Sequence, residues 1–323
     1  MIMNALFGKK KLTEDASRSS AIGRFAPSPT GPLHAGSLLA ALASYLEAKS
    51  GSWLVRIEDV DRPRTVAGTS AAQLATLAAY GFSWSADAVV YQSQRTALYE
   101  SALHALISAN LGYPCTCSRS VLAGRTETRI GVDGARIYDG HCSHWQKGDP
   151  VPQNAAWRFR VGDPGDAPVV FHDRIQGLQE QQLARDVGDF VIKRADGCFT
   201  YQLAVVVDDM AQGVTQIVRG ADLLDSTARQ IALIRALGGH LPTYAHIPVL
   251  TNAAGDKLSK QTRAQALAIA TENERVRALW QALVFLGQQP PSELNAETQP
   301  TLWAWATRHW DIGKVPKLRH LGV

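Results

Sequence analysis

The chain has 323 residues, which at roughly 150 residues per domain predicts about two domains, or one domain with a large insertion. Hydrophobic residues make up 46% and charged residues only 19%, and this balance excludes a largely disordered chain. The formal net charge of +4 is too small to establish a nucleic-acid partner, although it is compatible with a polyanionic ligand.

Residues 1–20 are expected to form a flexible leader. Their apolar start is short, and Lys9, Lys10 and Lys11 follow it instead of preceding it, which excludes a secretory signal. The sequence has no run of about 18 apolar residues that would predict a membrane span. Four cysteines are too few for the disulfide framework of a secreted protein. We therefore expect a cytoplasmic protein without a membrane partner, and we expect a monomer.

An α/β pattern opens the folded part of the chain. Residues 22–26 read as a strand, the prolines within 27–32 prevent a helix there, and residues 36–49 carry leucines at helical spacing. Residues 53–57 form a second buried strand that runs into the acidic segment 58–61. A strand, a helix and a second parallel strand are typical of the start of a doubly wound α/β domain.

This pattern is interrupted once and then resumes. The helices predicted next cover 69–80 and 95–109, and residues 113–185 are rich in turn residues and read as an insertion with a short strand at 157–161. From residue 190 the α/β pattern returns, with elements at 190–193, 201–210, 216–218, 226–237 and 245–250. The tail, 264–323, is predicted to hold two or three helices. We therefore divide the chain after the leader into 21–112, 113–185, 186–250 and 251–323.

The turn after the first strand has features of a phosphate-binding site. A helix begins within His34 to Ser37, and the free backbone N–H groups at a helix start attract phosphate. Gly36 has no side chain, so a flat base can lie against the backbone. His34 can donate to a phosphate oxygen whose charge grows during reaction. The alternative is an ordinary turn with a surface histidine.

A second basic motif lies more than two hundred residues later. Lys257 and Lys260 are three residues apart and flank Ser259, after a glycine at 255. Two such lysines can hold a polyphosphate. Taken alone, this segment is better explained as a solvated basic turn. The two motifs together are much more specific than either one.

These residues resemble a known family. The segment His34-Ala35-Gly36-Ser37 resembles the HIGH signature of class I aminoacyl-tRNA synthetases, and Lys257 to Gln261 resembles their KMSKS loop, with departures at Ala35, Ser37, Leu258 and Gln261. The flanking segments resemble the glutamyl branch of the family, at 24–31, 56–59, 201–209 and 219–222. The resemblance covers residues 22–263 and implies an α/β fold with a Rossmann-like class I catalytic domain.

Length separates the members of this branch. A full glutamyl-tRNA synthetase has a large C-terminal anticodon-binding region, whereas only residues 264–323 follow the second motif here. The chain therefore resembles the truncated glutamyl-Q tRNA(Asp) synthetase family. That resemblance implies activation of L-glutamate by ATP, with Mg²⁺ and without tRNA, and transfer of glutamate to queuosine at the wobble position of tRNA(Asp). It also implies an inserted zinc-binding subdomain and a short helical C-terminal region.

Two other functions remain open. The chain can be an ordinary glutamyl-tRNA synthetase that works without its anticodon domain, or a non-catalytic RNA-binding paralogue. The presence of both His34 and Lys260 counts against the non-catalytic alternative.

The resemblance also implies the site residues. The catalytic residues would be His34, Lys257 and Lys260, and ATP would contact His34, Gly36, Ser37, Lys257, Ser259 and Lys260. The glutamate site would comprise Arg24, Phe25, Ala26, Pro27, Ser28, Glu58, Tyr201 and Arg219. Two arginines suit the two carboxylates of glutamate, and Glu58 suits its ammonium. The alternative is that both arginines form structural ion pairs, with Glu58 and Asp222.

Three of the four cysteines cluster within the expected insertion. Cys115, Cys117 and Cys142 fit one structural zinc, because a tetrahedral site takes two close ligands and then a second close group. The fourth ligand is Tyr138 by resemblance to the glutamyl-Q family, whereas His144 fits the pattern of the longer synthetases and is the commoner ligand type. Reduced thiols without a metal are the remaining alternative, and Cys198 reads as a core residue.

Overall fold

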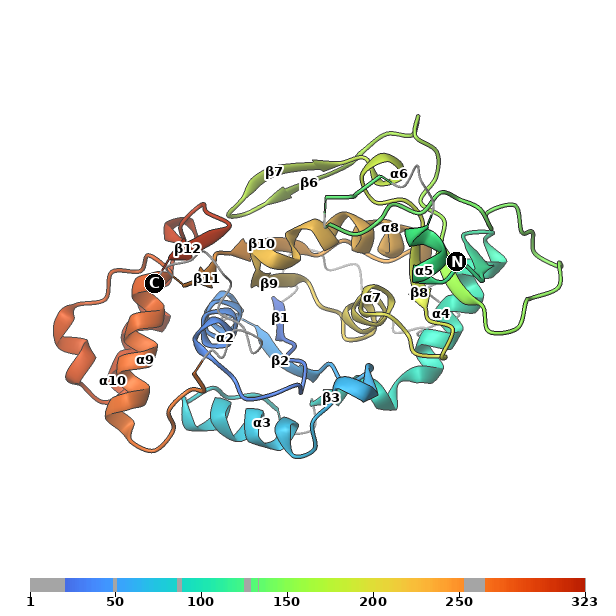
Figure 1. Cartoon of the computed structure of the whole chain (residues 1–323). Helices are drawn as coiled ribbons and strands as arrows, with labels where there is room; N and C mark the ends of the chain where they lie inside the picture. The colour runs from blue at the N-terminus through green and yellow to red at the C-terminus, as the bar shows by residue number, and fades with distance from the viewer. Residues whose placement is uncertain are drawn as a thin grey trace, which may run out of the picture.

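The computed structural model describes residues 21–48, 51–85, 89–124, 129–132, 134–252 and 265–322 (Figure 1). No helix within these ranges is both long and apolar enough to cross a lipid bilayer.

A parallel sheet begins the fold as the sequence predicts. Strand β1 (Ile22–Phe25) pairs in parallel with β2 (Ser52–Ile57), and β2 pairs in parallel with β3 (Val90–Tyr91). Helix α2 (Ala35–Glu47) connects β1 to β2, and α3 (Thr69–Ala79) follows β2. The leucines predicted at helical spacing in α2 are buried, so they anchor the helix against the sheet.

The second half of the sheet lies on the other side of β1. Thr215 N donates to Ile22 O at 2.9 Å, immediately before β9 (Gln216–Gly220). Strand β10 (Thr243–Ile247) pairs in parallel with β9. The strands therefore run β3-β2-β1-β9-β10 across the molecule. This arrangement confirms the predicted α/β fold.

Three helices form a second packed layer. Helix α4 (Thr96–Ser108) contacts α7 (Tyr201–Ala211) and α8 (Thr227–Leu237), which is preceded by a 3₁₀ turn, Ala221–Ser226. Their apolar side chains share one hydrophobic core with β9 and β10. Helix α7 is buried along most of its length, and this burial includes its two acidic residues, Asp208 and Asp209.

A small antiparallel sheet lies beside this layer. It joins β4 (Gly112–Cys115), β5 (Ala156–Phe159) and β8 (Phe190–Lys193). The predicted strand at 190–193 and the helices and strands predicted after it are confirmed, but this strand pairs with β5 of the expected insertion and not with the main sheet. A short apolar run signals a buried strand but carries no information on its partner.

A hairpin from the expected insertion extends the main sheet. Strands β6 (Val169–Asp173) and β7 (Gly177–Gln181) are antiparallel, and β6 adjoins β10 through the parallel register pair Asp173–Tyr244. The expected boundaries around 113–185 stay a prediction, and strand pairing crosses them. The short helices and 3₁₀ turns not yet named are α5 (Arg119–Ala123), α6 (Leu183–Asp186), Arg62–Arg64, Gln92–Gln94, Ser292–Ala296 and Ile312–Lys314.

The tail contains the predicted helices, α9 (Glu272–Phe285) and α10 (Gln299–His309). Tryptophans attach them to the α/β core: Trp303 Nε1 donates to Tyr80 O, and Trp310 Nε1 donates to Glu47 Oε2, each at 2.9 Å. Figure 1 shows these helices at the opposite end of the molecule from α4 and α5.

The chain then returns to the α/β core. Strand β12 (His320–Gly322) pairs in parallel with β11 (Val249–Thr251), which follows β10. The last described strand therefore lies beside the strand that leads toward the Lys257 segment.

A buried network of charges joins α7 to the sheet. The Arg56 guanidinium is fully buried, and its Nη1 lies 2.7 Å from Asp209 Oδ1. Its other nitrogens lie 3.5 Å from Glu58 Oε1 and 3.9 Å from Asp208 Oδ2. Arg95 Nε lies 2.6 Å from Asp208 Oδ1. Because buried charges are tolerated only when they are paired, this network fixes α7 against β2 and α4.

We predict that Asp208→Ala lowers the free energy of unfolding by about 3–5 kcal/mol, because the half-buried Arg95 loses its close carboxylate and the buried Arg56 loses one of its carboxylates. The hydroxyl of Tyr99, 2.8 Å from Asp208 Oδ2, would lose its acceptor as well. Equilibrium urea denaturation measures the change. Arg185→Ala is the matched control, since Arg185 is exposed and its ion pair among the described residues is with neighbouring Asp186. Equally small effects of both substitutions would contradict the structural role of the network.

Candidate active site

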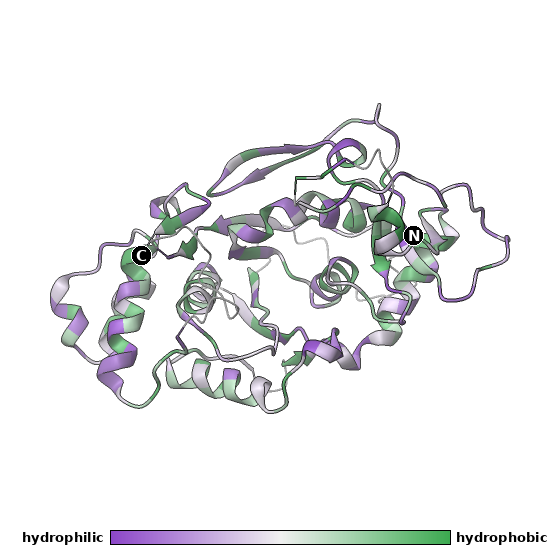
Figure 2. Ribbon diagram, in the orientation of Figure 1, coloured by the Kyte–Doolittle hydropathy of each residue, from purple (hydrophilic) through white to green (hydrophobic). Residues whose placement is uncertain are grey.

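Three strands of the sheet each place one arginine near their carboxyl end: Arg24 on β1, Arg56 on β2 and Arg219 on β9. All three side chains are buried. Strands β8 and β11, in contrast, carry no arginine and are hydrophobic along most of their length (Figure 2). Ligands of open α/β sheets bind at the carboxyl ends of the strands, so this edge is the candidate active site.

Arg24 is neutralised by a carboxylate of α7. Its Nε lies 3.2 Å from Asp209 Oδ1, so the ion pair with Glu58 considered from the sequence is not the one formed. Burial acts to raise the pKa of Asp209, but Arg24 and Arg56 more than offset burial, and the pKa is lowered. The Asp209 carboxylate is therefore ionised, and it balances charge from both arginines.

Arg219 has neutral partners instead. Its Nε donates to His246 Nε2 at 2.9 Å, its Nη2 donates to Thr227 Oγ1 at 2.9 Å, and its Nη1 donates to Tyr201 Oη at 3.3 Å. No carboxylate of the described residues lies within 4.0 Å of this guanidinium, and this includes Asp222, the alternative partner considered from the sequence. The positive charge of Arg219 is therefore not balanced by an ion pair in this part of the chain.

Glu58 follows β2 and is almost completely buried. Burial raises its pKa to about 7, although Arg56 and Arg24 act to lower it. Its Oε1 accepts no hydrogen bond from the described residues. Glu58 is thus a hydrogen-bond acceptor in a poorly solvated position. Such a carboxyl group suits a cationic group of a ligand.

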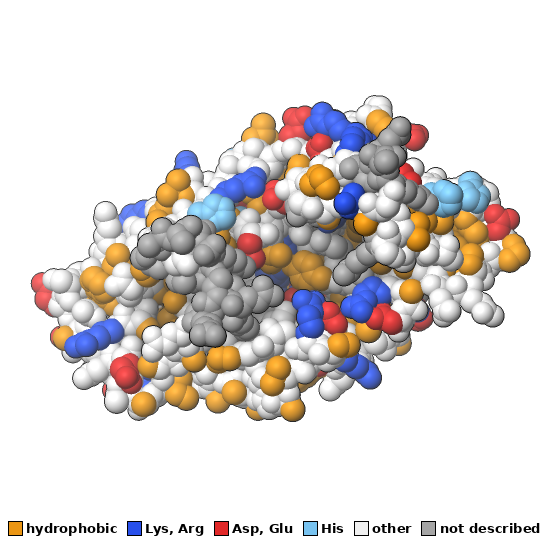
Figure 3. Space-filling model, in the orientation of Figure 1, with side chains coloured by type: hydrophobic (Ala, Val, Ile, Leu, Met, Phe, Trp, Pro, Cys, Tyr) orange, Lys and Arg blue, Asp and Glu red, His pale blue; other side chains and the backbone are white. Residues whose placement is uncertain are grey.

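A cavity of about 1200 Å³ joins part of the predicted glutamate site. Ala26, Ser28, Glu58 and Tyr201 all line it. Charged side chains from several elements also line it: Asp61, Arg64, Arg158, Arg194, Asp196 and Asp222. Figure 3 shows this face of the molecule hollowed at its centre. The space exceeds what an amino acid needs, so a second, larger group has room beside it.

The other predicted glutamate-site residues lie around this cavity without lining it. Phe25 stacks against Trp53 in the core at a centroid distance of 6.3 Å. Pro27 contributes its carbonyl, which accepts from Glu58 N at 3.0 Å. Arg219 reaches toward the cavity through its contact with Tyr201.

His34 caps the first turn of α2. Its Nδ1 accepts from Ser37 N at 3.4 Å, and Ser37 Oγ accepts from His34 N at 3.4 Å. An accepting Nδ1 leaves the proton of a neutral ring on Nε2, where it can be donated. Gly36 lies in the same turn. The structure therefore brings together the three described residues of the predicted ATP site.

The remaining ATP-site residues, Lys257, Ser259 and Lys260, lie outside the described residues. Their C-terminal flank is described: Ala266 forms a β-bridge with His34, and Leu267 N donates to Leu33 O at 3.0 Å. The residues that follow the lysines in sequence, Ala266 and Leu267, therefore lie next to the start of α2.

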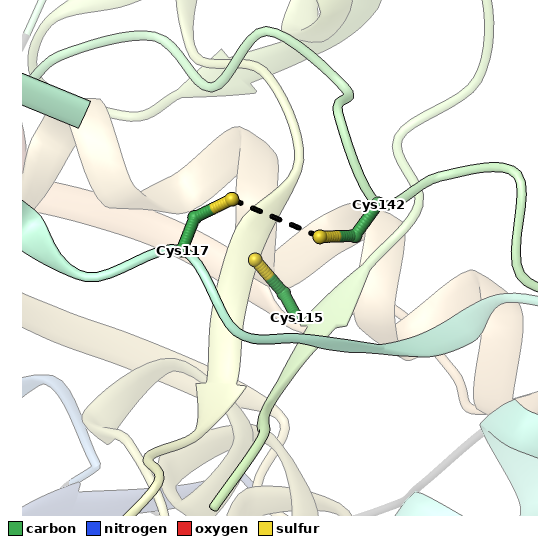
Figure 4. Close-up of side chains that lie close together, drawn as sticks. All are labelled: Cys115, Cys117 and Cys142. Carbon is green, nitrogen blue, oxygen red and sulfur yellow. Dashed lines mark hydrogen bonds between the residues drawn. The ribbon is translucent and has the colours of Figure 1, made fainter. Parts of the chain in front are cut away.

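The three clustered cysteines converge as predicted (Figure 4). The sulfurs of Cys115, Cys117 and Cys142 all lie within 4.8 Å of one another, and those of Cys117 and Cys142 are 3.7 Å apart. Two thiolates on a tetrahedral zinc with Zn–S bonds of about 2.3 Å would lie about 3.8 Å apart. The donor set and its spacing therefore suit a metal such as zinc.

Tyr138 joins this cluster and His144 does not. The Tyr138 hydroxyl lies 3.3 Å from Cys115 Sγ and 3.7 Å from Cys117 Sγ, and it accepts from Cys142 N at 2.8 Å. His144 Nδ1 lies 3.1 Å from His141 O, and its ring is outside the group of metal-ligating side chains. Of the two fourth ligands considered from the sequence, the geometry favours Tyr138.

Several functional residues escaped prediction from the sequence. Asp208 and Asp209 follow three valines in an apolar helix, and such a buried acidic pair signals cationic partners. His246 was likewise a lone histidine in an apolar strand. Its partner Asp173 lies 73 residues earlier in the expected insertion, and no local pattern links the two.

Comparison with known proteins agrees with this geometry. The family described as tRNA synthetases class I (E and Q), catalytic domain, matches residues 21–301. The glutamyl-Q tRNA(Asp) synthetase of Thiobacillus denitrificans is 51% identical over 92% of this chain and 96% of its own length. The protein of that name from Chromobacterium violaceum is 52% identical over 91% of this chain and 95% of its own length.

Two solved structures share the fold. A glutamate tRNA ligase from Elizabethkingia meningosepticum, in complex with its amino acid, has a TM-score of 0.72 at 22% identity, and the match covers 93% of this chain and 66% of that one. The glutamate-tRNA synthetase of Elizabethkingia anophelis has a TM-score of 0.73 at 23% identity, with 94% and 68% covered. They confirm the predicted Rossmann-like class I fold. The chain belongs to the class I tRNA synthetases of the E and Q type and, within them, to the glutamyl-Q tRNA(Asp) synthetases.

Proposed function

We propose that the protein activates L-glutamate with ATP, without tRNA, and transfers the glutamyl group to queuosine at the wobble position of tRNA(Asp). Similarity over nearly the full length of the glutamyl-Q relatives supports this reaction. One structural observation supports glutamate as the substrate. Among the described residues, no group donates a hydrogen bond to Glu58 Oε1 and no carboxylate pairs with Arg219, and both side chains lie near Tyr201.

These groups complement the charges of glutamate. The carboxylate of Glu58 would accept the substrate ammonium, and Arg219 would bind one substrate carboxylate. Tyr201 lies between them, and burial raises the pKa of its hydroxyl, which keeps it a neutral hydrogen-bond donor. Arg24 would contribute donors without excess charge, because Asp209 balances it.

Activation needs no protein nucleophile. The substrate α-carboxylate attacks the α-phosphorus of ATP, the bond to the bridging oxygen breaks, and pyrophosphate leaves. His34 Nε2 and the backbone N–H groups at the start of α2 would stabilise the growing phosphate charge. Lys257 and Lys260 would hold the leaving pyrophosphate, and Ser259 would complete the ATP site. Mg²⁺ bound to the phosphates would neutralise part of their charge.

Transfer then consumes the adenylate. A hydroxyl of the modified base attacks the activated carbonyl, AMP leaves, and an ester joins glutamate to the base. The unfilled part of the 1200 Å³ cavity, beyond Glu58 and Tyr201, is large enough for a nucleoside.

The expectation of a cytoplasmic monomer stays a prediction.

The cysteine cluster would hold one structural zinc. Cys115, Cys117 and Cys142 supply three sulfurs, and we propose the Tyr138 oxygen as the fourth ligand. The metal would join β4 to the loop around 138–142, because those segments carry the ligands. Cys117 also lines the cavity, so the metal would stiffen one of its walls.

The reaction predicts where label from glutamate appears. Purified protein with ATP and labelled glutamate should label queuosine-containing tRNA(Asp), and it should leave queuosine-free tRNA(Asp) and tRNA(Glu) unlabelled. Label on tRNA(Glu) would instead indicate an ordinary glutamyl-tRNA synthetase. Absence of glutamate-dependent pyrophosphate exchange would favour a non-catalytic RNA-binding protein.

The raised pKa of Glu58 predicts a pH dependence of glutamate binding. The carboxyl must ionise to bind an ammonium, so below its pKa of about 7 affinity should fall, at most about tenfold per pH unit, and protons should be released on binding. The stability of the ligand-free protein depends on pH in the opposite direction from glutamate affinity. The folded state holds this proton more tightly than the unfolded state, so the contribution of Glu58 to stability decreases as pH rises from 4.5 to about 7.

Isothermal titration calorimetry between pH 5.5 and pH 8, in buffers of different ionisation enthalpy, measures both affinity and proton release. Glu58→Gln should bind glutamate weakly with a flat pH profile. An unchanged pH slope in this variant would assign the titration to another group.

The metal centre predicts a difference between two cysteines. Protein purified from zinc-supplemented medium should hold about one zinc per chain, and Cys117→Ser should lose it and melt at a lower temperature, because a thiolate ligand is gone. Cys198→Ser is the matched control, because Cys198 is a free cysteine outside the cluster. Equal metal content in both variants would refute the site.

A further inference from the structure

A chain of buried hydrogen bonds runs from the β6–β7 hairpin to the candidate glutamate site. Asp173 Oδ2 lies 2.6 Å from His246 Nδ1, and His246 Nε2 lies 2.9 Å from Arg219 Nε. Asp173 and His246 are fully buried, and Arg219 is 5% exposed. His246 and Arg219 are register partners on β10 and β9, so the chain crosses three strands of the sheet.

The hydrogen bonds determine which nitrogen of His246 carries the proton. Arginine can only donate, so His246 Nε2 must accept from Arg219, and the ring proton must be on Nδ1, where it is donated to Asp173. Burial lowers the pKa of His246 to about 4, despite the hydrogen bond to Asp173, so the ring is neutral at pH 7. The opposite tautomer would point an N–H at the guanidinium.

Asp173 is itself held in place. Its Oδ1 accepts from the backbone N–H groups of Ile175, Gln176 and His246, at 3.0, 2.9 and 3.1 Å. Burial opposes its ionisation, but these bonds and the one from His246 outweigh burial and lower the pKa of Asp173 to about 2. The carboxylate is therefore a fixed acceptor for His246 and faces the ring instead of the arginine.

This arrangement orients the arginine without neutralising it. A carboxylate placed directly against Arg219 would balance its charge, as Asp209 does for Arg24 at 3.2 Å. A neutral imidazole fixes the side chain equally well and leaves the cation available. Thr227 has the same property, since its hydroxyl accepts from Arg219 Nη2 and carries no charge.

We propose that Asp173 and His246 are positioning residues that hold Arg219 in the conformation that binds a substrate carboxylate and preserve its positive charge for that purpose. This inference rests on the proposed glutamate site. It gives the β6–β7 hairpin, far from the nucleotide motifs in sequence, a part in amino-acid recognition.

The variants His246→Leu and Asp173→Asn test the proposal. Each should raise the Kd for glutamate at least about tenfold, because a buried donor or acceptor of the chain loses its partner, and each should leave the Kd for ATP unchanged. The double variant should bind no worse than His246→Leu, since both substitutions break one chain. His246→Gln should recover part of the affinity, because its amide oxygen can still accept from Arg219.

Gln176→Ala is the matched control. Its side chain bonds the carbonyls of His246 and Leu318 in the same region but does not touch the imidazole or Arg219. It should leave glutamate affinity unchanged. Additive losses in the double variant, an equal loss in Gln176→Ala, or parallel losses for glutamate and ATP would overturn the positioning role.

A second measurement does not depend on activity. Nitrogen-15 NMR of the histidine rings in the wild-type protein, with His246 assigned through His246→Gln, should show a neutral Nδ1–H tautomer between pH 6 and pH 8. An Nε2–H tautomer or an imidazolium would overturn the proposal. If the wild-type protein bound no glutamate, the proposed function would fail, and the tautomer alone would decide whether the chain of bonds exists.

Discussion

The buried guanidinium of Arg56 is the constraint on which the site depends. A charge removed from water in the centre of a sheet must be surrounded by acceptors, and α7 supplies two of them, Asp208 and Asp209. Asp209 then also reaches Arg24 on the neighbouring strand, and Asp208 reaches Arg95 at the start of α4. One ionic requirement thus fixes the distances between β1, β2, α4 and α7. The position of Glu58, directly after β2, follows from it.

The two arginines assigned to glutamate binding differ in their surroundings. Arg24 belongs to the buried network of charges, whereas the partners of Arg219 among the described residues are neutral side chains and a backbone carbonyl. In the proposed site, an arginine without a carboxylate partner among the described residues suits a carboxylate of the ligand, and the side chain of glutamate has this group whereas that of glutamine does not. Glutamine would leave the charge of Arg219 without compensation in a poorly solvated position, so it would be rejected by an unpaired charge and not by its size.

Local sequence patterns predicted the positions of helices and strands better than they predicted which strands pair with one another. The leucine spacing placed the helix that became α2 within two residues at each end, and the apolar tail gave α9 and α10. The strand at 190–193 was found, but its pairing with β5 was not, because hydrogen bonds between distant segments leave no mark on a short apolar run. In the site, resemblance supplied Glu58, Tyr201 and Arg219 at once. Their supporting residues could not be found in this way, because Asp209 on α7 and His246 on β10 meet their arginine partners only in the folded molecule. The choice between Tyr138 and His144 required the geometry of the loop.

The pairing of β11 with β12 gives the C-terminal residues an importance that their exposure hides. Strand β11 ends at Thr251, shortly before the segment that carries Lys257 and Lys260, and its described strand partner is 320–322. Strand β11 is therefore completed by residues that come much later in the sequence. This pair can form only after residues 320–322 have been synthesised, and thus later than the pair of β10 with β9. Removal of residues 320–322 would therefore act on β11 before it affected the core.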